Sequence, residues 1–120
     1  MANEIQFQGS LMASKNGTSI NKNANANLSM AGSQMTQQTM NVPTAWTLLV
    51  FGNLAGVPAK LMIKNLDPTN YVQLAGDNAG AQLQDKIQPG GDFVLRSPVG
   101  VIYAKANAAA CLIEYAAMDQ

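Results

Sequence analysis

The chain has 120 residues, which suits one domain with a single core, and its hydrophobic share of 48% argues against wholesale disorder. Only 12% of residues are charged, and seven basic side chains balance seven acidic ones, so the basic cluster that nucleic-acid binding needs is missing. There is one cysteine and no histidine, which excludes an internal disulfide and any catalytic or metal site built on imidazole.

The first 30 residues alternate between apolar and polar side chains, a period of two that is typical of strands. One run covers residues 5–12, and after a turn at Lys15–Asn16–Gly17 a second covers Thr18 to Met30. Thirteen extended residues would span about 43 Å, roughly twice the usual strand. We therefore expect an extended N-terminal segment that either bends through a bulge or projects as an arm onto a neighbouring subunit.

The apolar row of this segment is the candidate interface, and the opposite row is a ladder of amides. The whole chain has 22 Asn and Gln residues, which cover the surface in place of charges. A neutral amide surface is buried against a partner more cheaply than ions are, and it lacks the charge repulsion that keeps proteins apart. The predicted contact residues are Ile5, Phe7, Leu11, Ile20, Ala24, Ala26, Leu28 and Met30.

Gly32–Val42 is polar and poorly patterned, and we interpret it as a loop or weak strand, so that residues 1–42 form the arm and 43–120 a separate domain. In that domain, short apolar runs recur between turns rich in Gly, Pro, Asn and Asp, which predicts an all-β sandwich of about eight strands, most simply a jelly roll. Lys60–Leu66 and Tyr71–Ala75 are expected to pair as a hairpin, and Ala108–Ala110 could alternatively start a short helix. The predicted strands are Trp46–Phe51, Lys60–Leu66, Tyr71–Ala75, Gln82–Ile87, Asp92–Arg96, Val101–Ala106 and Ala110–Ala116.

Groups with catalytic potential are sparse. Most carboxylates lie in turns, where they accept backbone hydrogen bonds, and only Glu114 is inside a predicted strand. Asp77–Gly80 lacks the alternating ligands of a calcium loop, and Cys111 shares a row with apolar residues, as a buried thiol does. We predict no catalytic, cofactor-binding or metal-binding residues, and no enzymatic activity. Four rings have the amphipathic character to stack on sugars or to sit in the core: Trp46, Tyr71, Tyr103 and Tyr115.

The N-terminus gives no sign of export. Residues 1–10 are polar and include Glu4, unlike a signal peptide, and the longest apolar runs are too short to span a bilayer. We therefore expect a soluble protein made in a cytoplasm, without membrane contact.

The C-terminal part has a series of turn-and-strand signatures, over about residues 43–118. They lie in Lys64–Leu74, Ile87–Leu95, Ile102–Asn107 and Leu112–Tyr115. With these stretches the chain resembles small virion proteins of tailed bacteriophages, in which an Asn-Leu-Asp hairpin precedes a Pro-Gly-Glu-Phe turn and a Tyr-Ala-Lys-Ala strand. Here the turn reads Gly91–Asp92–Phe93, so the usual glutamate is replaced or shifted.

The resemblance implies a β-sandwich attached to a phage head or tail, and within that group a capsid decoration (cement) protein. Its partners would be the major capsid protein and neighbouring copies of itself, as a homo-dimer or homo-trimer on the head surface of the virion, after synthesis in the host cytoplasm. The alternative is a tail or fibre module that binds host glycans, which requires at least two exposed rings on one face. An enzyme is the third and least favoured hypothesis.

Overall fold

The computed structural model describes residues 5–28, 35–51, 54, 58 and 60–118, apart from the side chains of Phe7 and Leu28. The chain divides into two compact units, Met1–Ala31 and Gly32–Gln120. Ten strands form in the described residues, and every pairing between them is antiparallel. The prediction of an all-β protein is confirmed.

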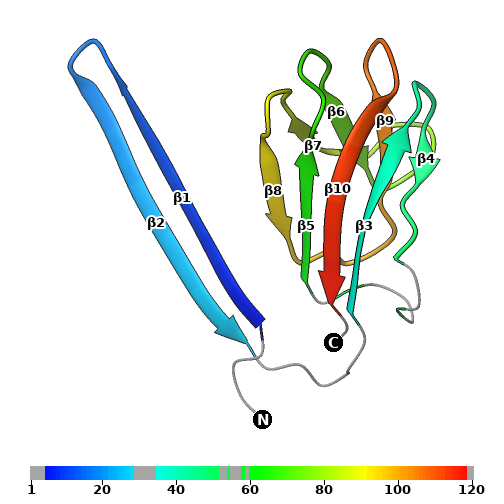
Figure 1. The fold of residues 1–120 in the computed structure, drawn as a ribbon, viewed down its shortest axis with the longest axis horizontal. Coiled ribbons are helices and arrows are strands. Elements are labelled where there is room, and N and C mark those ends of the chain that lie inside the picture. The colour runs from blue at the N-terminus through cyan, green and yellow to red at the C-terminus, as the bar shows by residue number, and fades with distance from the viewer. Residues whose placement is uncertain (1–4, 29–34, 52–53, 55–57, 59, 119–120) are drawn as a thin grey trace. The chain divides into compact units, whose positions relative to one another are not determined.

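The first unit is a hairpin of two 11-residue strands, β1 (Ile5–Lys15) and β2 (Thr18–Leu28) (Figure 1). Its two-residue turn is Asn16–Gly17, whose φ angles of 52° and 80° both lie in the left-handed region. Asn and Gly tolerate that region better than other residues, and this turn has the twist that two antiparallel strands need. The sequence placed the turn correctly.

The second unit is a sandwich of two four-stranded sheets (Figure 1). One sheet has the order β3-β10-β5-β8 and the other β4-β9-β6-β7. The strands are β3 (Met35–Val42), β4 (Thr47–Leu48), β5 (Lys60–Asn65), β6 (Val72–Ala75), β7 (Leu83–Ile87), β8 (Phe93–Arg96), β9 (Tyr103–Ala106) and β10 (Cys111–Met118).

The eight strands pair in a nested order: the first pairs with the last, the second with the second to last, and so on. β3 pairs with β10, β4 with β9, β5 with β8 and β6 with β7. All successive strands of this unit except β6 and β7 therefore lie in different sheets. The expected hairpin of Lys60–Leu66 with Tyr71–Ala75 is wrong, because β5 and β6 belong to opposite sheets.

The boundary of the sandwich also differs from the expected one after residue 42. Met35–Val42 pairs with β10 along its whole length, so it belongs to the sandwich, in the unit Gly32–Gln120. This strand is polar because it lies at a sheet edge, where only Val42 is fully buried. The expected strand over Trp46–Phe51 shrinks to Thr47–Leu48, and Ala108–Ala110 is not helical.

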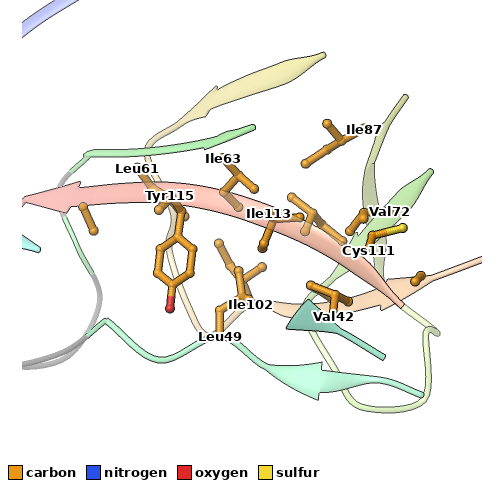
Figure 2. Packing of buried hydrophobic residues seen from close by; sticks show 14 residues of the cluster. Val42, Leu49, Leu61, Ile63, Val72, Ile87, Ile102, Cys111, Ile113 and Tyr115 are labelled. Carbon is orange, nitrogen blue, oxygen red and sulfur yellow. The ribbon is translucent and has the colours of Figure 1, made fainter. Parts of the chain in front are cut away.

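The core fills the space between the two sheets (Figure 2). On β10 every second residue is buried, which places Ile113 and Tyr115 in the core beside Cys111 and leaves Leu112 outside. On β5 the buried apolar side chains are Leu61 and Ile63. The opposite sheet and its flanking segments supply Leu49, Val72, Leu74, Ile87, Ile102 and Ala104.

Two sets of polar interactions hold the sandwich together, a hydrogen-bond network around Asn65 and an ion pair. Asn65 is fully buried and shares its amide N–H groups among the carbonyl oxygens of Asn70, Ile87 and Gln88, at 2.9, 3.1 and 3.2 Å. Its Oδ1 accepts a hydrogen bond from the backbone N–H of Asp67 at 2.9 Å. Asn65 thus ties the loop after β5 to the loop after β7.

The second interaction is an ion pair at one side of the sandwich. Arg96 on β8 donates to Asp85 on β7, and these are edge strands of opposite sheets. Both strands expose an unpaired backbone edge, and charged side chains at such edges discourage pairing with another chain. The ion pair therefore joins the two sheets and protects their edges.

Candidate functional site

The register of the hairpin gathers the predicted contact residues onto one face. Directly opposed residues of an antiparallel pair share a face. Leu11 lies opposite Lys22, Ala13 opposite Ile20, and Gly9 opposite Ala24. The same row continues through the pairs Phe7–Ala26 and Ile5–Leu28. Seven of the eight predicted positions therefore form a single row, which we call the hairpin apolar face.

The side chains of this face differ in exposure. Leu11 is 64% exposed and Ile20 51% exposed, and Ala24 and Ala26 are also exposed. Ile5, by contrast, is buried, with 1% of its surface accessible. The side chains of Phe7 and Leu28, and the whole of Met30, lie outside the described residues. The exposed side chains that this face offers to a partner are therefore those of Leu11, Ile20, Ala24 and Ala26.

The opposite face is an amide ladder. Gln8 lies opposite Asn25, Ser10 opposite Asn23, and Met12 opposite Asn21. Nothing on this face carries a charge, and the two lysines of the hairpin, Lys15 and Lys22, belong to the apolar row. Because Ile5–Leu28 contains no carboxylate, the apolar face is electropositive and suits a partner with acidic groups.

The hairpin is a two-stranded sheet in the part of the chain that the structure describes. An isolated two-stranded ribbon is marginally stable in water, because its apolar side chains have no further layer to pack against. Its strands, about 36 Å long, also offer backbone N–H and C=O groups along both outer edges. Such a ribbon can bind another protein by adding a strand at an edge or by covering its apolar face.

A second apolar surface, which the sequence analysis missed, lies on the outer face of the β3-β10-β5-β8 sheet. It includes Met35, Met62, Phe93 and Leu112, which are 63%, 37%, 45% and 40% exposed. The signal was present in β5, where Met62, between Lys60 and Lys64, is a large apolar side chain on the face opposite Leu61 and Ile63.

Three aromatic rings lie toward the outer face of the other sheet, each half-buried: Trp46, Tyr71 and Tyr103. Lys86 Nζ is 4.2 Å from the ring centre of Tyr71, and Lys105 Nζ is 5.8 Å from that of Trp46. Gly80, with a φ of 74°, packs on Trp46 so closely that a Cβ would be 2.7 Å from the ring. Tyr115 is unavailable to ligands, because its buried hydroxyl donates to the carbonyl of Val50 at 2.6 Å.

The carboxylates of the loops bind backbone, as predicted. Asp67 accepts hydrogen bonds from the N–H groups of Asn70 and Thr69, at 2.6 and 3.0 Å, and these bonds lower the pKa of its carboxyl. Asp77 and Asp92 accept equivalent bonds in their own loops. No three His, Cys, Asp or Glu residues within the described ranges form a group that could hold a metal ion.

Cys111 is buried in the core, as its position in the apolar row predicted. Burial raises the pKa of its thiol, and the charge of Asp67 raises it further. A thiol of raised pKa is mostly protonated at neutral pH and reacts slowly. Its role in the structure is that of a small apolar side chain.

Among the described residues there is no helix of the length and apolarity that a bilayer crossing requires. Comparisons with protein-family models, with curated proteins and with solved structures gave no match to this chain.

Proposed function

We propose that this chain is a virion structural protein of a tailed bacteriophage, a capsid decoration or cement protein that stabilises the head shell by protein–protein contacts. The observation that carries the proposal is the hairpin apolar face, in which Leu11 and Ile20 remain more than half exposed on a ribbon of two strands. A face of this kind gains most from being covered by another protein.

The mechanism is shared burial. The hairpin docks on the major capsid protein or on a neighbouring decoration subunit, either by adding a strand at an edge or by covering its apolar row. Lys15 and Lys22 then lie against acidic groups of the shell, which orients the contact more than it strengthens it. Each contact is weak, and many symmetric copies make the sum firm.

The nested pairing of β3 to β10 supports assigning the sandwich to the jelly rolls. An eight-stranded jelly roll is a long hairpin of four strand pairs rolled into two sheets, and the four pairs here follow that order. Jelly rolls occur in viral capsids and also in lectins and cupins. The fold therefore agrees with a virion protein, and the functional assignment depends on the hairpin apolar face.

The test uses two neighbouring positions on β2 that face opposite ways. Ile20→Lys places a charge on the apolar face, and Asn21→Lys places the same charge on the amide face. The proteins are mixed with empty heads of the parent phage and sedimented, and the heat resistance of the heads is measured. We expect the wild type and Asn21→Lys to co-sediment and to protect the heads, and Ile20→Lys to lose both properties.

If the wild type neither co-sediments with the heads nor raises their resistance to heat, the proposal is wrong. Equal binding by the two lysine variants would place the contact elsewhere on the chain.

A glycan-binding tail or fibre module is the second candidate, favoured by the three half-buried rings on one sheet. Sugars stack on the flat faces of aromatic rings, but lysines already lie over Tyr71 and Trp46. This makes the surface a poorer stacking platform than exposed rings would be. Binding on a glycan array that is lost in Tyr103→Ala would favour this candidate, and an array without hits would remove it.

A further inference from the structure

The outer face of the β3-β10-β5-β8 sheet has apolar side chains on β10, β5 and β8, polar ones along most of β3, and one pair of opposite charges at its centre. The strand register places Ala116 beside Met62, and Met62 beside Leu95. The next row places Glu114 beside Lys64, and Lys64 beside Phe93. Glu114 and Lys64 lie on β10 and β5, the two inner strands of the sheet. We call these side chains, with Met35, Leu112 and Met118 of the same face, the outer sheet face.

Within the described part of the chain, Glu114 and Lys64 form no ion pair inside one copy. One salt bridge is recorded among the described residues, and it joins Arg96 to Asp85. Lys60, the other cation of the face, is engaged by a hydrogen bond to Ser97. Glu114 and Lys64 are therefore one negative and one positive charge at the centre of the face, and this pair is complementary to the same pair of a second copy.

We propose that the outer sheet face binds the same face of a second copy, around a two-fold axis that runs along the strands between β10 and β5. That axis lays β10 of one copy over β5 of the other. Glu114 then meets the second copy's Lys64, and Lys64 its Glu114. In the neighbouring row Met62 packs on the second copy's Ala116, a long flexible side chain against a small one, and the reverse contact repeats it.

The size of the face sets the strength of the contact. Four strands at about 4.8 Å spacing and six residues of about 3.3 Å cover roughly 400 Å². Two copies therefore bury about 800 Å² of flat area, below the standard 1,600 Å² interface, so the dimer is weak in isolation. We expect it to form at protein concentrations on the order of 100 µM. This inference goes beyond the proposed function and does not depend on the hairpin.

The charge pair provides the test, in the full chain, by sedimentation equilibrium over a concentration series. Glu114→Lys sets lysine against lysine across the axis, and Lys64→Glu sets glutamate against glutamate. Each variant alone should raise the dimer dissociation constant about tenfold or more, because like charges then meet in both contacts. An equimolar mixture of the two variants should restore association to within about threefold of wild type, because both contacts are again of opposite charge.

Three controls separate this contact from other effects. Lys105→Glu makes the same change of charge on the opposite sheet and should leave association unchanged. The double variant Glu114→Lys with Lys64→Glu repairs the pair within one copy as well as between copies. If it recovers and the mixture of single variants does not, the effect is internal and the inference is wrong.

The last control measures the dimer in Ile20→Lys, where the hairpin apolar face is disabled. Persistence of the dimer there assigns it to the outer sheet face, and its loss assigns it to the hairpin and overturns the inference. Absence of wild-type association up to about 1 mM would also overturn it. Neither result bears on shell binding, which is measured with heads and with the hairpin variants.

Discussion

The hairpin and the sandwich are built from the same alternation of apolar and polar residues, yet only the sandwich covers its own apolar rows. In β10 the inward row, Ile113 and Tyr115 among them, meets a second sheet and is almost fully buried. In the hairpin the corresponding row leaves Ile20 half exposed. Alternation therefore establishes which side chains share a face, and the presence of a second layer decides whether that face is core or interface.

The comparison is sharpest for two isoleucines, and here we expect the largest effect. Ile113→Ala should lower the free energy of unfolding by about 2–5 kcal/mol, since it removes buried methylenes and leaves a cavity. Ile20→Ala should change it by less than about 0.5 kcal/mol in the free protein. Urea unfolding measures both, followed by Trp46 fluorescence for the sandwich and by far-ultraviolet circular dichroism for the whole chain. A comparable loss in the two variants would mean that the hairpin face is covered in the isolated chain.

Two asparagines extend the comparison to polar residues. Asn65→Ala removes the amide that binds three carbonyl oxygens and the N–H of Asp67, and it should destabilise the sandwich by about 2–4 kcal/mol. Asn23→Ala, in the exposed amide ladder, should have an effect within about 0.5 kcal/mol in the same urea titration. If Asn65→Ala costs less than about 1 kcal/mol, the two loops do not depend on this residue.

The smallest expected effect is a pH dependence confined to the sandwich, because Ile5–Leu28 contains no carboxylate. Backbone hydrogen bonds lower the pKa of Asp67 below its ordinary 3.8 in the folded state. Its contribution to stability is therefore present at neutral pH and is lost as the pH falls through that lowered value. Asp67→Asn should flatten the loss of thermal stability below about pH 4. An unchanged acid profile in the variant would remove Asp67 as its source.

Local rules predicted the hairpin well. The Asn16–Gly17 turn follows from backbone sterics, and the rows of Leu11 and Ile20 follow from the side-chain period once the turn is placed. The burial of Cys111 and the backbone contacts of Asp67 were predicted for similar reasons. In each case the relevant partner is close in sequence or lies on the same strand.

Long-range pairing was predicted poorly. β3 was read as a loop or weak strand because its polar residues lack a local strand signal, and pairing with β10, about 75 residues later, supplies the missing stability. Lys60–Leu66 and Tyr71–Ala75 looked like a hairpin because they are close in sequence, yet they lie in opposite sheets. The outer sheet face was missed because Met62, Glu114 and Leu95 meet only after β10, β5 and β8 pair.

The sequence by itself determined that this protein is all-β, where most of its strands lie and which residues of each strand share a face, because those properties depend on neighbours along the chain. The tertiary structure alone decided which strands pair, where the sandwich begins and which apolar faces remain open. Those outcomes depend on the order of strands within the sheets, and alternating polarity carries no information about that order.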